Sequence, residues 1–509
     1  MQPLQNLSFT DLANWQYLLP ELTLAAAFLL LIVVDLLLPS PRGRSVIGAL
    51  SIGALALAAF FTAQQLGSDQ AAAFIHNAYR IDDYANLFKL IFLGSAALLI
   101  FMSLGSLKKE EVPNQGELYY LYLPAVLGAM VLASSGELIT LFVGLELLSI
   151  SSFILVGMRK NDSHSTEGAF KYVVLGGISS AFVLYGMSFL YGITGTTDIA
   201  LMRESLLSSG GSFTALIYVS FFLMLTGIGF KIAAAPFHSW AADVYQAAPV
   251  PVAGFLSVVS KGAGFALLFR LVYNIFYGLG DEAVPIHNDI FLAVSVLSAA
   301  AMIVGNTMAL RQRNVKRMLA FSGIANSGYL LVPLSLQFTA VHFDIFSEMI
   351  YYLIAYAFMN IGAFAVFLAV SRSAGHEEVS GFAGLYYRSP STAVAAVLLV
   401  LSLAGIPLTG GFIGKLYILL GTMESQVYWL GTVMLVTSVI SYYYYFSVVR
   451  QMFMRQGIES SLTMALPLRI TIWLCAAASV ALGILPGPVT RAIHSVFSLS
   501  YDLLYQAVS

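Results

Sequence analysis

The chain has 509 residues, of which 59% are hydrophobic and only 10% are charged. Soluble domains carry roughly a quarter of charged residues, so the composition excludes an ordinary soluble enzyme and predicts a protein solvated by a lipid bilayer. The single cysteine, Cys475, excludes a Cys-ligated iron–sulfur cluster, a Cys-ligated zinc or a disulfide framework within the chain. A net charge of −2 without a long basic run gives no sign of nucleic-acid binding.

Apolar runs long enough to span a bilayer recur along the whole chain. A transmembrane helix needs roughly 20 apolar residues, and about fourteen such runs are present. They are expected near 18–38, 45–65, 84–105, 117–134, 137–157, 166–191, 213–248, 252–278, 288–309, 315–335, 343–371, 391–423, 426–453 and 467–487. The runs are continuous rather than alternating, which excludes a β-barrel and predicts an all-α polytopic membrane protein.

Basic residues are unequally divided between the two sides of these spans. No Lys or Arg precedes the first run, whereas Arg42 and Arg44 follow it, which favours a retained helix over a signal peptide. The connections after odd-numbered spans carry 15 Lys and Arg, against three on the other side, Arg80, Arg203 and Arg491. This bias predicts that the odd connections lie in the cytoplasm and both termini lie outside.

Proline interrupts the seventh and twelfth spans, at Pro236 and Pro407. Units of five helices begin and end on opposite faces, so two tandem units would be inverted repeats, each with a broken helix. The expected division is 1–116 for helices 1–3, 117–278 for helices 4–8, 288–453 for helices 9–13 and 454–509 for helix 14 and a short tail. The alternative is that proline is simply tolerated in membrane helices.

Five charged residues fall inside the expected spans: Glu146, Lys171, Lys231, Lys261 and Lys415. Each opposes insertion by roughly 2.5–3.5 kcal/mol at the bilayer centre, so such groups face a protein interior or a hydrated cavity. Lysine suits a proton pathway because burial readily shifts its proton affinity. The five residues are therefore candidates for an ion or proton route.

Glu146 lies midway along its span, and a buried lysine is its expected partner. A pair about 4 Å apart at an effective dielectric near 20 attracts by about 4 kcal/mol. Lys231 stands five residues before the Pro236 break, and His238 would share its helix face if the helical period continued through the break. A static ion pair at Glu146 and a structural histidine at 238 are the alternatives.

The remaining candidates differ in their surroundings. Lys261 is flanked by small residues that leave room for water, and Lys415 follows the second break. Lys171 lies nearer a helix start and would alternatively reach the interface.

Other polar residues carry weaker signals. Lys89 and Arg270 are expected to reach the interface or an acidic loop. The tyrosines at 442–445 would supply hydroxyls to a water chain, although aromatic packing or an interfacial belt is the favoured interpretation. His342 and Glu348 are weak candidates for a proton exit.

Several long motifs occur in one order: GLELLSISSF, AFKYVVLGGISSAFVLYG, GFKIAAAPFHSWAADVYQAAPVPVAGFLSVVSK, RQRNVKRMLAFSGIANSGYLL and SLAGIPLTGGFIGKLY. Together, from about residue 117 to 450, they resemble the antiporter-like membrane subunits of respiratory complex I.

The resemblance implies a role for each buried charge. Glu146 would be the fifth-helix glutamate, Lys231 the broken-helix lysine, Lys261 the lysine that links two half-channels, and Lys415 the terminal lysine toward the outer side. Lys171 would be an auxiliary lysine on the input side. The implied cofactors, NADH, FMN, iron–sulfur clusters and quinone, would lie in other subunits, with none in this chain.

Among the paralogous types the sequence is most similar to the N type. The chain ends soon after span 14, Lys415 stands where the M type generally has glutamate, and VYQAAPVPV is the N-type form of its segment. The resemblance implies M-, K- and J-type partner subunits in a bacterial inner membrane and proton transport driven by quinone reduction. The alternatives are a subunit of a multi-subunit sodium/proton antiporter and a scaffold whose lysines serve assembly.

Overall fold

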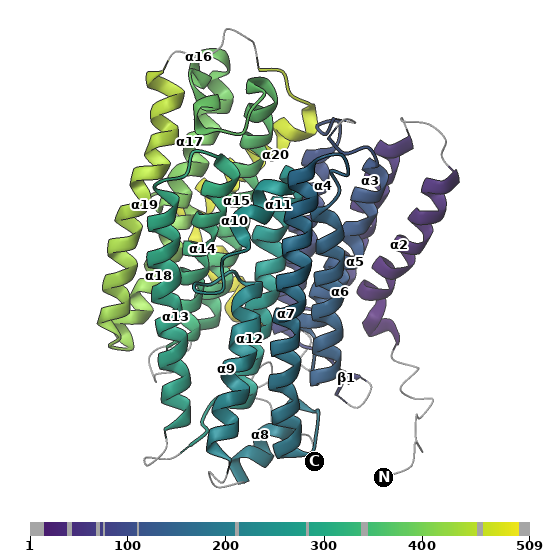
Figure 1. The fold of residues 1–509 in the computed structure, drawn as a ribbon, viewed down its shortest axis with the longest axis vertical. Helices are drawn as coiled ribbons and strands as arrows, with labels where there is room; N and C mark the ends of the chain where they lie inside the picture. Colours follow the sequence, from purple (N-terminus) through teal and green to yellow (C-terminus); the bar gives the residue numbers. More distant parts are fainter. Residues whose placement is uncertain are drawn as a thin grey trace.

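The protein is a bundle of long, roughly parallel helices (Figure 1). The computed structural model describes residues 15–37, 43–67, 72–74, 77–108, 111–208, 213–280, 285–336, 345–455 and 462–497. Twelve helices among these residues are long and apolar enough to cross a membrane. The expectation of an all-α polytopic membrane protein is therefore confirmed.

The N-terminal part contains three long helices and a small hairpin. Its elements are η1 (Trp15–Leu18), α2 (Leu19–Leu37), α3 (Gly43–Gln64), β1 (Ala72–Phe74), β2 (Tyr79–Ile81) and α4 (Asp83–Ser103). The strands pair antiparallel, with Ala73 opposite Arg80. Asp82 caps α4 by accepting a hydrogen bond from the backbone N–H of Ala85, which satisfies one of the free donors at the helix start.

The next part covers the expected spans 4–8. Its elements are α5 (Gln115–Ala133), α6 (Leu138–Val156), α7 (Ser163–Thr194), α8 (Ile199–Ser208), α9 (Thr214–Lys231), α10 (Ala241–Ala247), α11 (Val250–Phe255), η2 (Leu256–Ser260), α12 (Lys261–Leu271) and η3 (Val272–Phe276). The break predicted in span 7 is confirmed, because α9 ends at Lys231 and α10 begins at Ala241. The elements from α11 to η3 form one buried span, Val250–Phe276.

The last part covers spans 9–14. Its elements are α13 (Ile286–Ala309), α14 (Val315–Leu334), α15 (Ile345–Ala374), η4 (Val379–Phe382), α16 (Leu385–Arg388), α17 (Pro390–Ala404), α18 (Gly410–Glu424), α19 (Tyr428–Met454), α20 (Leu466–Ile484) and α21 (Pro486–Val496). The predicted break in span 12 separates α17 from α18.

Two of the expected spans, 315–335 and 391–423, are not among the twelve long apolar helices of the described residues. The helix α14 has the length of a span but is more polar, with Ser322, Asn326 and Ser327 on it, and nearly all of it is buried. The span formed by α17 and α18 is divided into two short helices. Other helices enclose α14 and satisfy polar groups that lipid would leave unpaired, whereas α17 and α18 are only partly covered.

Close glycine crossings occur at the start of each predicted five-helix unit. A Cβ on Gly144 of α6 would lie 2.7 Å from the backbone N of Leu132 on α5. A Cβ on Gly328 of α14 would lie 2.7 Å from the backbone N of Met302 on α13. Small residues allow such close contact between membrane helices. Each crossing joins the first two spans of its unit. The inverted relation of the two units and the domain limits stay predictions.

Candidate functional site: a buried row of lysines

Lys231, at the last turn of α9, is buried and bonded to the helix that carries Glu146. Its Nζ donates to Ser149 Oγ at 3.0 Å, and Ser149 Oγ donates to the Leu145 carbonyl. Glu146 lies three residues before Ser149, and its carboxylate interacts electrostatically with Lys231. The contact differs from the direct ion pair expected from the sequence, because a hydroxyl holds the ammonium one turn away from the carboxylate.

Glu146 itself is partly exposed on the outer surface of the chain. Its Oε1 is buried and has no hydrogen-bond partner among the described residues. A buried carboxylate oxygen without a donor is costly unless an internal water molecule supplies one.

His238 lies in the break of span 7 and not on a helix. Residues 232–240 form turns, so the shared helix face expected for Lys231 and His238 does not exist. The imidazole interacts with the Pro236 carbonyl and packs edge-to-face on Phe321 of α14 at 6.5 Å. Its Nδ1 is buried without a partner among the described residues.

Lys261 begins α12 directly after the π-helical turn η2. Such turns are rare and redirect side chains, often at functional sites. Its side chain reaches α14, where a Cβ on Gly323 would lie 3.0 Å from Lys261 Nζ and 3.2 Å from Tyr356 Oη. Both polar atoms are buried without a hydrogen-bond partner among the described residues. Lys231 packs close by, against Gly264 one turn along α12.

A hydrogen-bonded row continues from Lys261 toward Lys415. Ser322, next to Gly323 on α14, bonds with the Tyr445 hydroxyl of α19. Asn326, one turn along α14, donates to the Ser322 carbonyl at 2.8 Å and accepts from Tyr352 Oη of α15 at 2.5 Å. The Tyr352 ring packs against Gly414, which precedes Lys415 in the chain. We name Ser322, Asn326, Tyr352 and Tyr445 the α14 polar row.

Lys415 on α18 turns back to the break in its own span. Its Nζ donates to the carbonyls of Leu403 and Ala404 at 3.3 and 3.2 Å, at the C-terminal end of α17. A cation is favoured there by the free carbonyls and the helix dipole. The ammonium also lies 4.5 Å from the ring centroid of Tyr329. Lys415 is thus buried and stabilised by backbone.

Lys171 lies apart from the other lysines. Its Nζ pairs with Glu167 at 2.8 Å and with Asp243 of α10 at 3.1 Å, and its side chain is 41% exposed. Asp243 also pairs with Arg317 of α14 at 2.6 Å. The predicted lysines at 231, 261 and 415 are therefore brought together along one buried row, whereas Lys171 belongs to an exposed ion-pair cluster.

The two basic residues expected at the interface are buried in ion pairs. Arg270 donates to both Asp82 oxygens at 3.1 and 3.0 Å and to the Ala133 carbonyl at 2.7 Å. Asp82 lies in the connection before α4, so the acidic-loop interpretation fits Arg270. Lys89 pairs with Glu21 of α2 at 3.0 Å. The interface interpretation is wrong for both, because helices from distant parts of the sequence cover these side chains.

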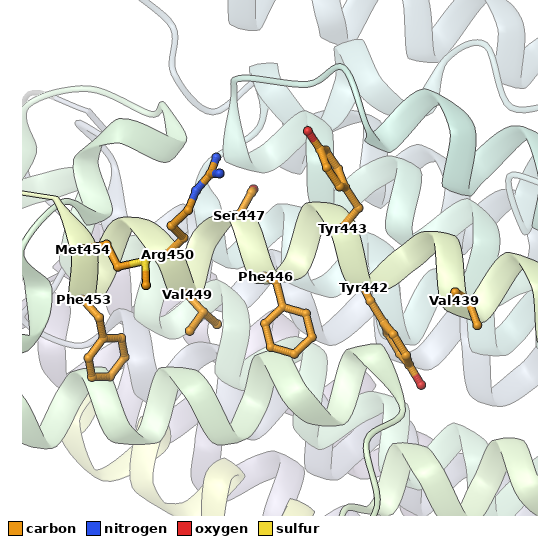
Figure 2. Close-up of a pocket in the computed structure, with 9 residues that line it drawn as sticks. All are labelled: Val439, Tyr442, Tyr443, Phe446, Ser447, Val449, Arg450, Phe453 and Met454. Carbon is orange, nitrogen blue, oxygen red and sulfur yellow. The ribbon is translucent and has the colours of Figure 1, made fainter.

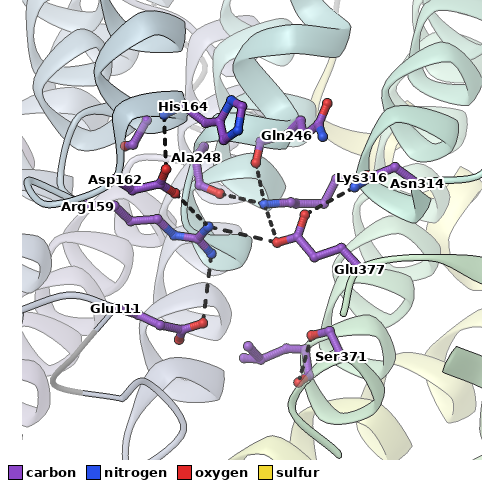
Figure 3. Close-up of polar contacts among 12 residues, drawn as sticks. Glu111, Arg159, Asp162, His164, Gln246, Ala248, Asn314, Lys316, Ser371 and Glu377 are labelled. Carbon is purple, nitrogen blue, oxygen red and sulfur yellow. Dashed lines mark hydrogen bonds and ion pairs between the residues drawn. The ribbon is translucent and has the colours of Figure 1, made fainter. Parts of the chain in front are cut away.

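The sequence analysis missed a polar network at one end of the bundle (Figure 3). Lys316 is fully buried; its Nζ donates to the carbonyls of Gln246 and Ala248 at 2.5 and 3.2 Å and pairs with Glu377 at 2.7 Å. Arg159 joins Glu377 at 3.8 Å.

This network also reaches the connection after span 3, through contacts of Glu111 with Arg159 at 4.0 Å and Arg372 at 3.8 Å. It therefore joins the connections after spans 3, 5, 7, 9 and 11, which places these five odd connections on one face. The signal in the sequence was the basic cluster RQRNVKR at 311–317.

The four consecutive tyrosines of α19 divide between two environments. Tyr444 and Tyr445 are buried and hydrogen-bonded, with Tyr444 Oη donating to Asn306 Oδ1 at 3.1 Å. Tyr442 and Tyr443 line a shallow apolar hollow; Figure 2 shows Tyr442 on the side of α19 that carries Phe446 and Phe453, and Tyr443 on the side that carries Ser447 and Arg450. Aromatic packing, the favoured expectation, thus applies to only part of the run.

Of the two candidate residues for a proton exit, His342 and Glu348, the structure describes only Glu348. His342 lies outside the described residues. Glu348 is buried in the first turn of α15 and interacts electrostatically with Tyr417, two residues after Lys415. Within the described part of the chain, no group of three or more His, Cys, Asp or Glu side chains is arranged to hold a metal ion.

The comparisons with known proteins agree with this geometry. A family model described as "NADH:quinone oxidoreductase/Mrp antiporter, TM" matches residues 135–441. A protein named NADH-quinone oxidoreductase subunit N from Paenibacillus sp. (strain JDR-2) is 50% identical over 96% of this chain and 97% of its own length. One of the same name from Brevibacillus brevis is 48% identical over 96% of both chains.

Solved structures give the same fold. A chain of respiratory complex I from Thermus thermophilus is 29% identical, covers 94% of this chain and 100% of its own length, and has a TM-score of 0.78. A chain of the Mrp complex from Dietzia, at 18% identity over 96% of this chain and 98% of its own, has a TM-score of 0.78 and supports the fold alone. The chain belongs to the family of NADH-quinone oxidoreductase subunit N, the antiporter-like membrane subunits of complex I.

Proposed function

We propose that this subunit carries protons across the membrane along Glu146, Lys231, Lys261 and Lys415, driven by quinone reduction in other subunits. As a member of the subunit N family, the chain is part of an oxidoreductase whose redox cofactors are bound by other subunits. The contribution of this chain would be the proton route itself.

One observation carries the proposal: Lys261 Nζ is fully buried and has no hydrogen-bond partner among the described residues. An isolated ammonium in protein interior costs several kcal/mol, so the site requires water molecules as partners. Hydration at Lys261 would join the Lys231 end of the row to the α14 polar row, which leads to Lys415. The α14 polar row supplies hydroxyl and amide groups at each turn, as a proton relay needs.

The first break supplies the switch. Lys231 bonds to Ser149 and interacts with Glu146 through space. Moving one charge against 100 mV takes about 2.3 kcal/mol, whereas a charge pair at a dielectric near 20 and 4 Å gives about 4 kcal/mol. The longer separation enforced by Ser149 lowers this value toward the energy that one charge requires. In this proposal, a change of charge at Glu146 drives Lys231 toward proton release.

Orientation follows from the basic residues. The odd connections carry 15 Lys and Arg against three on the other side, and five of these connections share one face, so we assign that face to the cytoplasm and the termini to the outer side of a bacterial inner membrane. Uptake would then occur from the end that carries α16, and release from the end that carries α8 (Figure 1).

Neighbouring subunits would complete the two ends of the row. Glu146 is partly exposed at the surface of the chain, which fits a contact with a small membrane subunit of the K or J type. The exposed apolar face of α19 around Phe446 and Phe453 fits a contact with an M-type subunit. The sodium/proton antiporter alternative is weaker, because the Mrp likeness rests on low sequence identity.

The test is Lys261→Met in the assembled complex, with NADH oxidation, proton uptake and complex abundance measured together. Methionine keeps the length of the buried stem and removes the charge. We expect normal assembly and a lowered proton-to-electron ratio. An unchanged ratio would refute the route, and loss of complex in proportion to loss of activity would favour the scaffold alternative.

A further inference from the structure

Four buried hydroxyls outside the lysine row gather around Lys261. They belong to Tyr172 on α7, Tyr245 on α10, Ser260 at the end of η2 and Tyr356 on α15, and none has a hydrogen-bond partner among the described residues. The three tyrosines are also fully buried within the bundle. We name these four side chains the hydroxyl cluster.

The members of the hydroxyl cluster lie within reach of one another. Tyr172 and Ser260 interact through their hydroxyls without direct hydrogen-bond geometry, and Tyr245 interacts electrostatically with both Tyr172 and Tyr356. Tyr356 Oη and Lys261 Nζ both face Gly323. The cluster therefore ends at the unpartnered ammonium of Lys261.

Packing alone does not account for these hydroxyls. The Tyr172 ring stacks on Trp240 at 4.6 Å and meets Phe153 edge-to-face at 4.7 Å, contacts that phenylalanine would make equally well. A buried hydroxyl without a partner costs about 1–3 kcal/mol. Four such groups beside an unpartnered ammonium form a polar site with the two to four partners that each ordered water requires.

Two members of the hydroxyl cluster adjoin an accessible ion pair along the chain. Lys171 precedes Tyr172 on α7, and Asp243 stands two residues before Tyr245 on α10; these two paired side chains are 41% and 38% exposed. Tyr172 lies nine residues into α7 from Ser163, about 14 Å along the axis at 1.5 Å per residue. Polar side chains therefore extend from the exposed Lys171–Asp243 pair to the buried hydroxyls beside Lys261.

We propose that Tyr172, Tyr245, Ser260 and Tyr356 form a water-filled proton uptake path that joins the Lys171–Asp243 pair to Lys261. The inference rests on the proposed function and deepens it, because it assigns Lys261 its own supply of protons. Lys231 is a poorer terminus for this path, since Ser149 already accepts a hydrogen bond from its ammonium. Each hydroxyl both donates and accepts, so a proton passes along the path without leaving a charge on any tyrosine.

The experiment compares tyrosine-to-phenylalanine variants in the assembled complex reconstituted into vesicles. Tyr245→Phe, Tyr356→Phe and the double variant remove only oxygen atoms. Tyr351→Phe is the matched control, because Tyr351 lies on the same helix as Tyr356, is equally buried and donates to the Leu482 carbonyl at 2.5 Å. The readouts are complex abundance, the proton-to-electron ratio and the solvent isotope effect on turnover.

We expect the double variant to assemble normally and to lower the proton-to-electron ratio toward that of Lys261→Met. We expect each single variant to raise the solvent isotope effect, whereas Tyr351→Phe leaves both quantities unchanged. If Lys261→Met lowers the ratio but the phenylalanine variants do not change either quantity, the uptake path is refuted and the proposed function stands. If Lys261→Met also leaves the ratio unchanged, the proposed function itself fails. Should the double variant assemble poorly, the isotope effects of the single variants decide.

Discussion

The pair formed by Lys316 and Glu377 offers the sharpest energetic test, because its lysine is fully buried and its carboxylate belongs to a network that joins several connections. Glu377 is 28% exposed and also accepts from Asn314 Nδ2 at 3.2 Å, whereas the Lys316 side chain is completely buried. Removing one member of a buried pair typically costs 3–5 kcal/mol. Lys316 retains two carbonyl partners in Glu377→Gln, so we expect a cost of about 3 kcal/mol, at the lower end of that range.

Lys316→Met should cost a similar amount for a different reason. It leaves the carbonyls of Gln246 and Ala248 without their donor at the end of α10, and each unsatisfied buried acceptor costs about 1–3 kcal/mol. The double variant removes both charges together and therefore avoids an isolated buried ion. We expect it to cost less than the sum of the single variants, with a coupling of about 2 kcal/mol.

The assay is the thermal unfolding midpoint of the subunit in purified complex, measured for all four members of the cycle. Lys160→Met is the control, since Lys160 pairs with Glu117 at 3.3 Å but is 55% exposed, and surface pairs contribute at most about 1 kcal/mol. Additive shifts in the cycle, or a loss in the Lys160 variant equal to that in the Lys316 variant, would refute the reasoning.

Three further predictions concern other parts of the bundle. Asp82→Asn leaves the buried Arg270 guanidinium without its carboxylate partner, so the complex abundance should fall, and a partial recovery in Asp82→Asn combined with Arg270→Met would identify the buried charge as the cause. Gly305→Leu should prevent assembly, because a Cβ there would lie 2.8 Å from the Phe321 carbonyl; normal complex on a native gel would contradict it. Ser149→Ala removes the acceptor of Lys231 and should shift the pH dependence of proton pumping with assembly intact, and an unchanged pH profile would exclude a role for this bond.

The fold was largely predictable from the sequence because span length and breaks are local properties. Continuous apolar runs defined the helices, and the prolines at 236 and 407 located both breaks. The helix α14 is the instructive case. It is long but polar, and its burial depends on neighbours that no local pattern reveals.

The sequence allowed the lysines of the candidate site to be predicted, but not the side chains that they contact. Buried charge alone indicated Lys231, Lys261 and Lys415, since insertion into a bilayer makes such residues costly. The Ser149 hydroxyl beside Lys231 was missed because serine is common in membrane helices and carries no charge. His238 was misplaced for a geometric reason: helical periodicity was extended across 232–240, where the chain turns instead.

The two breaks hold their lysines in chemically different ways, and the difference bears on direction. Lys231 donates to a hydroxyl on another helix and interacts electrostatically with the Glu146 carboxylate. Lys415 donates to backbone carbonyls of its own span, which do not titrate. The groups that hold Lys415 therefore keep a constant charge. In the proposed route, the protonation of Lys415 would follow the supply through the α14 polar row, whereas that of Lys231 would respond to Glu146. Control at the first break and passive release at the second would then give the proposed route a direction.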